Sequence, residues 1–317
     1  MVKAYKSNVP DTFHSLSVLE YLLKRFPYHS EEEWTLRILQ NQVLVNESKV
    51  PPRHILTKGD EVAYLPLDLS RGEPPINIEY TIVYENSDFL VVNKPPNIPV
   101  HPSGRYRTHT LLNLLENERG IGTCFPVHRL DRETSGVMIF AKKKSYQLML
   151  QTLFEQRLVQ KHYRIFVFGE FPQSVKAEGF IGPDKTSEIR KKQRYHTDQF
   201  ENAKFCITEF NLISYHPAKL ISYLEVKPAT GRIHQIRATL LSLGYPVVGD
   251  KLYGIRETAF LDFVNHGETK SLSKELGHSR QALHATEISF FDSISETDFH
   301  FSAPISQDLI SLVVSNP

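Results

Sequence analysis

A proline-rich stretch at residues 66–77, PLDLSRGEPPIN, separates two parts of the chain that differ in sequence pattern. It holds three prolines and one glycine, which interrupt helices and strands alike. Apolar residues at helical spacing precede it, and short strand-like runs follow it. We therefore predict a small module at residues 13–66, a linker at residues 67–77 and a larger domain at residues 78–317. A turn within a single domain is the alternative interpretation.

The small module begins with two predicted helices. The first carries apolar residues at spacings of three and four, which places them on one helical face: Leu16, Leu19, Leu23 and Phe26. Ser30 is suited to cap the second helix, and Glu31–Glu33 suit its positive end. That helix presents Trp34, Ile38 and Leu39 and breaks off at Asn41. Two strands, residues 43–46 and 61–65, follow it, the second after a Gly59-Asp60 turn.

The larger domain mixes strands with irregularly spaced helices. Strands are predicted at residues 80–84, 89–92, 137–140, 163–168, 204–213 and 221–226, and helices at residues 110–118, 145–156 and 233–243. Gly244 is suited to end the last of these helices. Because no strict βαβ repeat is present, we predict an α+β domain with a mixed, largely antiparallel sheet and flanking helices.

Composition excludes several classes of protein and leaves others open. The net charge of +1 neither indicates nor excludes an RNA partner. The two cysteines, Cys124 and Cys206, stand far apart and outside any CxxC, which argues against a disulfide framework and a cysteine zinc site. None of the 14 histidines lies in a recognised metal-ligand pattern, so we expect no metal. The absence of a signal-like N-terminus and of a long apolar run favours a cytoplasmic protein.

The segment VHRLDRETSG at residues 127–136 places Asp131 between Arg129 and Arg132. A carboxylate beside guanidinium groups stays ionised and can act as a nucleophile or base. Small residues follow, suited to a close approach of the backbone: Thr134, Ser135 and Gly136. An ion pair that only stabilises a turn is the alternative.

A second segment, residues 229–253, carries Arg232 and Arg237. Being five residues apart, they need not share a helix face, so one can meet a carboxylate and the other a phosphate. Gly231 precedes a predicted helix whose N-terminus is suited to bind an anion. His234 is a possible general base, although a packing or hydrogen-bonding role is commoner for histidine. A basic surface helix is the alternative.

A third segment, KHYRIFV at residues 161–167, begins a strand with Tyr163, an aromatic residue that can stack on an extruded base. A core or edge-strand tyrosine is the alternative. Two short basic runs, residues 142–144 and 190–194, are interpreted as solvated loops or as phosphate contacts.

Taken together, these segments resemble the RluA-type family of RNA pseudouridine synthases. The resemblance rests on VVNKPPNIPVHPSG, HRLDRETSG, KHYRIFV, TGRIHQIR, GYPVVGDKLYG and ALHA, which follow one another in the family's order. It implies an isomerase that acts on uridine in folded RNA after flipping it from its stack. Because the net reaction adds no group and changes no redox state, it also implies no cofactor and no metal. We further expect a monomer.

The resemblance also implies roles for single residues. Asp131 matches the family's nucleophilic aspartate, Tyr163 its active-site tyrosine, and Arg237 the arginine that pairs with the aspartate. Arg129 resembles the arginine that helps to displace the target base. We expect the remaining residues to contact the substrate: Arg232, His234, Thr134, Ser135 and Gly136.

The chain departs from the family pattern at Thr239, where the family usually has a histidine, so some local hydrogen bonding must differ. The small module resembles an RNA-binding fold of a ribosomal protein, but residues 1–70 hold 8 Lys and Arg against 9 Asp and Glu. The HPSGRYR loop at residues 101–107 is similar to sequences in family members that act on transfer RNA, and the small module also occurs in ribosomal RNA enzymes. The resemblance therefore implies transfer RNA as the substrate, with ribosomal RNA as the alternative. A non-catalytic RNA-binding or ribosome-assembly protein and a small-molecule enzyme are the rival hypotheses.

Overall fold

The computed structural model describes residues 5–26, 29–65, 73–104, 106–118, 120–189 and 191–313. The distances between Cα atoms divide the chain into two units, one of Met1–Pro74 with Ser103–Thr108 and one of Pro75–Pro102 with His109–Pro317. Most of the predicted linker lies outside the described residues, as do Arg105 of the HPSGRYR loop and Arg190 of the second basic run. The boundaries at 66 and 78 therefore stay predictions.

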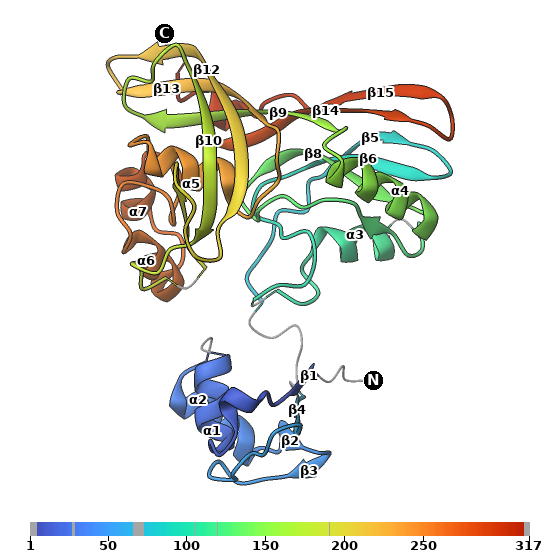
Figure 1. The fold of residues 1–317 in the computed structure, drawn as a ribbon, viewed down its shortest axis with the longest axis vertical. Helices are drawn as coiled ribbons and strands as arrows, with labels where there is room; N and C mark the ends of the chain where they lie inside the picture. The colour runs from blue at the N-terminus through green and yellow to red at the C-terminus, as the bar shows by residue number, and fades with distance from the viewer. Residues whose placement is uncertain are drawn as a thin grey trace. The chain divides into compact units, whose positions relative to one another are not determined.

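The first unit packs two helices on a four-stranded antiparallel sheet in the order β1-β4-β2-β3 (Figure 1). Its elements are β1 (Tyr5–Asn8), a 3-10 helix (Asp11–Phe13), α1 (Val18–Arg25), α2 (Glu31–Leu39), β2 (Val43–Val45), β3 (Ser48–Lys49) and β4 (Glu61–Tyr64). Both helices begin with a capping box, formed by Ser17 with Glu20 and by Ser30 with Glu33. The predicted cap at Ser30 is confirmed.

The buried faces of these helices differ in part from the predicted ones. In α1, Val18, Tyr21 and Leu22 are buried, whereas the predicted Leu19 and Leu23 are only partly covered. Leu16 lies before the helix, because the Ser17 cap sets its start, and apolar spacing alone did not locate that start. In α2, Trp34 and Ile38 are buried as predicted, but Leu39, the last helical residue, is 64% exposed.

The second unit contains an eleven-stranded sheet in the order β11-β10-β12-β13-β9-β14-β8-β6-β5, with β15 beside β14 and β7 beside β8. The strands are β5 (Thr81–Glu85), β6 (Phe89–Lys94), β7 (Phe125–Pro126), β8 (Ser135–Ala141), β9 (Gln160–Phe168), β10 (Ser174–Pro183), β11 (Gln193–His196), β12 (Lys204–His216), β13 (Ile221–Pro228), β14 (Leu283–Asp292) and β15 (Thr297–Ser302). Among the described strands only β14 and β8 run parallel. The mixed, largely antiparallel sheet is as predicted.

Helices cover both halves of this sheet (Figure 1). They are α3 (Leu111–Glu118), α4 (Lys144–Glu155), α5 (Gln235–Ser242), α6 (Ala259–His266), α7 (Lys270–Leu276) and α8 (Gln307–Ile310). Residues of α3 pack with one face of β6 and β8, and residues of α4 pack with the other face. Every residue of β8 is therefore buried, which is why this strand is an unbroken apolar run after Gly136.

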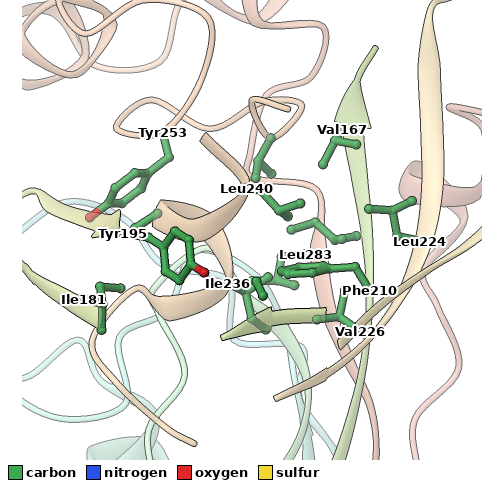
Figure 2. Packing of buried hydrophobic residues seen from close by; sticks show 14 of the residues in the cluster. Val167, Ile181, Tyr195, Phe210, Leu224, Val226, Ile236, Leu240, Tyr253 and Leu283 are labelled. Carbon is green, nitrogen blue, oxygen red and sulfur yellow. The ribbon is translucent and has the colours of Figure 1, made fainter. Parts of the chain in front are cut away.

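Helix α5 packs on the other half of the sheet through Ile236 and Leu240, whose side chains contact an apolar cluster that includes Val226 and Leu283 (Figure 2). Helix α5 starts at Gln235, two residues later than predicted, and Leu243 and Gly244 (φ +88°) end it. This packing holds the N-terminal end of α5, and with it Arg237, against strands β9, β13 and β14.

Candidate active site

The centre of the site is an ion pair between residues 106 positions apart in the sequence. Nη1 of Arg237, on α5, donates to Oδ2 of Asp131, in the loop before β8, at 2.8 Å. The Asp131 side chain is 25% exposed and the Arg237 side chain only 8%. The guanidinium is therefore fixed within the protein, while the carboxylate remains accessible.

A second carboxylate, Asp250, holds the other side of the same guanidinium. Nε of Arg237 donates to Oδ2 of Asp250 at 2.6 Å, and Nη2 donates to Oδ1 at 2.8 Å. Asp250 also accepts hydrogen bonds from the backbone N–H groups of Leu252 and Tyr253, at 2.9 Å each. Asp250 thus holds Arg237 in a bidentate contact through Nε and Nη2, and Nη1 is directed at Asp131.

These contacts determine the charge of Asp131. Burial by itself raises the pKa of this carboxyl, but Arg237 and Arg129 outweigh burial and lower the pKa below its ordinary value of 3.8. For Arg237, burial lowers the pKa, and the two carboxylates more than reverse that effect. At neutral pH Asp131 is therefore a carboxylate facing a permanent cation.

Arg132 does not share in this pair, although the sequence predicted Asp131 between two arginines. Nη2 of Arg132 donates to Glu133 instead. Glu133 is itself buried and also accepts from Nζ of Lys251 at 3.2 Å and from the backbone N–H of Gln281 at 3.0 Å. Arg132 and Glu133 lie in the turn before β8 and contact each other, so Arg132 forms its ion pair with Glu133 and not with Asp131.

His234 lies immediately before α5 in a left-handed conformation, with φ of 55°. Its Nδ1 is 2.8 Å from the hydroxyl of Tyr253, and its Nε2 is 3.8 Å from Oδ1 of Asp131. Burial, followed by Arg237, lowers the pKa of His234 to about 4. The ring is therefore neutral at neutral pH and faces Asp131 as a polar group, not as a cation.

Tyr163, on β9, packs against two of the apolar clusters of the sheet, the one that includes Val226 and Leu283 and the one that includes Leu130 and Met138. Burial and the charge of Asp131 raise the pKa of its phenol above the ordinary value of 10. Within the described ranges, its hydroxyl makes no hydrogen bond. Tyr163 thus combines an apolar ring face with an unengaged O–H group.

A cavity of about 150 Å³ opens beside these residues. It is lined by seven of the nine predicted site residues: Asp131, Tyr163, Arg237, Arg129, Arg232, His234 and Thr134. Nε of Arg232 donates to the backbone carbonyl of Phe205 at 3.0 Å, whereas Arg129 is exposed and has no ion-pair partner in the described part of the chain. This volume is below the roughly 300 Å³ at which pockets for whole ligands start, so it suits one part of a nucleotide, such as its base.

The other two predicted residues, Ser135 and Gly136, lie behind the cavity and do not line it. The Ser135 hydroxyl is 2.8 Å from Nδ1 of buried His284. Gly136 has φ of +114°, and a Cβ there would lie 2.1 Å from the carbonyl oxygen of Ala285. Their small size permits the close approach of β8 to β14, so a direct substrate contact for either stays a prediction.

Lys94 binds backbone carbonyl groups, including one in the loop that carries Asp131. It was not singled out from the sequence. It is fully buried, and its Nζ donates to the carbonyls of Pro95, Ile98 and Arg132 at 2.9, 2.9 and 3.0 Å. A lysine at the end of the apolar strand FLVVNK was the available signal. Asp250 lies in the motif GYPVVGDKLYG, but its spacing from Arg237 in the sequence did not predict a contact between the two residues.

Thr239, which replaces the family's usual histidine, is fully buried in α5. Its Oγ1 has no hydrogen-bond partner among the described residues. In the same ranges, no group of three or more His, Cys, Asp or Glu side chains is arranged to hold a metal ion. None of the described helices combines the length and apolar character needed to cross a membrane.

Comparison with known proteins identifies the family to which this geometry belongs. A family model described as RNA pseudouridylate synthase matches residues 88–242. Ribosomal large subunit pseudouridine synthase D of Buchnera aphidicola is 32% identical over 303 residues, which cover 92% of this chain and 92% of that protein. This chain belongs to the RNA pseudouridylate synthase family.

Two further relatives of this RNA pseudouridylate synthase show the range of the family. The mitochondrial tRNA pseudouridine(32) synthase of Saccharomyces cerevisiae is 32% identical over 252 residues, covering 78% of this chain and 53% of that protein. The solved structure of human RNA pseudouridylate synthase domain containing 1 matches with a TM-score of 0.58 and 26% identity, covering 73% of this chain and 86% of that one. The segments that build the Asp131 site lie mostly within the matched family region.

Proposed function

We propose that Asp131 acts as the nucleophile or base in isomerising a uridine that has been flipped out of a folded RNA. The contact between Arg237 and Asp131, at the wall of a cavity that Tyr163 also lines, carries this proposal. An ionised, oriented and accessible carboxylate is what attack on a sugar or uracil carbon requires. A cavity of about 150 Å³ suits a base that leaves its stack at a cost of a few kcal/mol, with the sugar and phosphate at the opening.

The reaction breaks the bond from the anomeric carbon to nitrogen, turns the uracil, and forms a bond from the same carbon to a ring carbon. Asp131 can attack the anomeric carbon, attack the uracil ring, or remove a sugar proton to form a glycal-like intermediate. Each route starts from the carboxylate that Arg237 holds ionised. The proton lost from the ring carbon balances the proton gained at nitrogen, so no oxidant, reductant or added group is needed.

The other cavity residues have complementary roles in this proposal. The Tyr163 ring stacks on the flipped uracil, and its raised pKa keeps the hydroxyl protonated at neutral pH, as a hydrogen-bond donor. Arg129, exposed and without an ion-pair partner in the described ranges, can occupy the space that the base leaves. Arg232, His234 and Thr134 line the cavity and contact the nucleotide.

The substrate class is either transfer RNA or ribosomal RNA. The resemblance of the HPSGRYR loop to family members that act on transfer RNA favours transfer RNA, whereas a relative that matches 92% of the chain is named ribosomal large subunit pseudouridine synthase D. Mapping pseudouridine across total RNA from a strain that lacks this protein, with and without re-expression, distinguishes the two. A uridine that is modified only when the protein is present identifies the target.

The test of Asp131 uses that RNA with tritium at carbon 5 of its uridines, so that each turnover releases tritium. Asp131→Asn should lower release by at least about a thousandfold, as loss of a nucleophile does, and leave RNA affinity within about threefold. Asp198→Asn, at an exposed loop carboxylate, is the matched control and should release tritium at the wild-type rate. Measurable pseudouridine from Asp131→Asn would contradict its role. If the wild-type protein released no tritium, a non-catalytic RNA-binding protein would be favoured.

A further inference from the structure

Lys161 lies on β9 two residues before Tyr163 and on the same face of the strand. Its side chain lines the cavity that Asp131 and Tyr163 also line. Nζ of Lys161 lies 5.9 Å from the centre of the Phe154 ring and 4.0 Å from where a Cβ of Gly231 would stand. The ammonium group therefore sits in the cavity wall between α4 and the loop that leads into α5.

No carboxylate neutralises this ammonium group. Within the described ranges, the ammonium group of Lys161 takes part in no ion pair and no hydrogen bond, although the side chain is largely covered. The charged and titratable groups that share its cavity or its surroundings are Arg129, Asp131, Tyr163, Arg232, His234, Arg237 and His128. Asp131 is the single carboxylate of that set, and Arg237 already holds it.

Burial lowers the pKa of Lys161 to about 8, and no neighbouring carboxylate acts to raise it again. An ammonium group that is partly desolvated and has no counter-ion costs free energy. A ligand that brings an anionic group next to Lys161 would offset this cost. Three other cations line the same cavity, and they make its surroundings attractive to the negative backbone of RNA.

We propose that Lys161 binds a backbone phosphate of the flipped nucleotide, next to the uracil that Tyr163 contacts. This inference rests on the proposed function, because it takes the base to enter the cavity of Asp131. Lys161 is a substrate-binding residue in this arrangement and takes no part in proton transfer. The phosphate supplies the missing counter-charge and sets the position of the sugar relative to Asp131.

The kinetic test compares Lys161→Met, which keeps the length and removes the charge, with Lys161→Arg, which keeps the charge. With the tritiated RNA, Lys161→Met should raise KM about tenfold and change kcat by less than about threefold, while Lys161→Arg stays near the wild type. Lys227→Met is the matched control, because Lys227 lies on the neighbouring strand β13, on the opposite face, paired with Glu225 at 3.1 Å. An unchanged KM, or a loss confined to kcat, would overturn the phosphate contact, the latter in favour of proton transfer.

A binding test separates this inference from the proposed reaction. In the Asp131→Asn background, adding Lys161→Met should reduce the slope of log affinity against log salt for the same RNA by about 0.7 to 1, the value of one phosphate contact. An unchanged slope refutes the contact, even if turnover behaves as proposed. If the wild type releases no tritium, the proposed reaction fails, and the slope still decides whether Lys161 meets a phosphate.

Acetylation with acetic anhydride as a function of pH, read for the peptide of Lys161 by mass spectrometry, tests the charge directly. Without RNA the apparent pKa should lie near 8. Saturating RNA should raise it, because a nearby phosphate favours the charged form. A pKa that is unchanged or lowered by bound RNA would mean that Lys161 faces an uncharged part of the nucleotide, and would contradict the proposal.

Discussion

The two units of the chain place their charges in opposite ways. In the first unit the carboxylates of Glu20 and Glu33 cap helices at the surface, and no charged side chain of its described residues is buried. The second unit buries Lys94, Arg237 and Asp250 beneath its active site. Burying an ion costs desolvation free energy, which its partners offset only in part. The second unit therefore carries an electrostatic cost that the first avoids, and in return holds Asp131 ionised and oriented.

The largest expected effect comes from breaking the buried ion pair of Asp250 and Arg237. Asp250→Asn should lower the free energy of unfolding of the second unit by about 4 kcal/mol, because it leaves the buried Arg237 with one carboxylate instead of two. Urea unfolding followed by circular dichroism measures it. The matched control, Glu201→Gln, removes an exposed carboxylate paired with Lys185 and should leave the midpoint unchanged. Equal shifts of the urea midpoint for both variants would contradict the prediction that buried charges contribute more to stability than exposed ones.

The same ion pair predicts that the stability of the protein depends on pH. Burial opposes the ionisation of Asp250, but Arg237 and two backbone N–H groups lower its pKa below 3.8. Because the folded pKa is the lower one, the stabilisation is fully present above about pH 4 and is lost as the pH falls through the folded pKa. The urea midpoint of the wild type should therefore fall more steeply below about pH 4 than that of Asp250→Asn. Parallel curves would show that Asp250 contributes no such stabilisation.

Gly136→Ala tests the close approach of strand β8 to strand β14 behind the Asp131 cavity. Its Cβ would lie 2.1 Å from the Ala285 carbonyl oxygen, so β8 and β14 must separate, at an expected cost of about 3 kcal/mol in unfolding free energy. Gly244→Ala is the control, since it has a similar positive φ but open space around it, and should cost about 1 kcal/mol. Equal costs for the two would assign the effect to backbone strain alone.

Tyr163→Phe keeps the ring of Tyr163 and removes its unengaged hydroxyl. We expect kcat for tritium release to fall about tenfold to a hundredfold with RNA affinity unchanged, because in the proposed reaction this hydroxyl donates to the reacting base. Tyr195→Phe, at a hydroxyl bonded to the carbonyl of Glu178 away from the cavity, is the comparison. Full activity of Tyr163→Phe would exclude proton transfer or donation by this hydroxyl.

The smallest expected effect lies in the first unit. Ser30→Ala removes the cap of α2 and should cost about 1 kcal/mol locally, seen as faster amide hydrogen exchange in residues 31–39. Because the first unit holds none of the residues that line the Asp131 cavity, kcat should not change. Loss of kcat in this variant would show that the first unit contributes to the reaction itself.

Local sequence signals predicted what depends on local interactions. The cap at Ser30, the strand after Gly136 and the end of α5 near Gly244 follow from residues within a few positions. The buried face of α1 was predicted only in part, because the cap that starts the helix shifts the face and spacing does not show it. The motif around Asp131 indicated a reactive carboxylate, and resemblance to a family indicated its partner, Arg237.

The sequence by itself determined the kinds of groups present: a carboxylate among arginines, a strand with a tyrosine, and a glycine suited to a close approach of the backbone. Only the tertiary structure decided which cation faces which anion, as Arg237 is shared by Asp131 and Asp250 while Arg132 turns to Glu133 and Lys161 has no counter-charge in the described ranges. The physical reason is that charge pairing depends on distance and burial, and the sheet brings together side chains that lie more than a hundred residues apart.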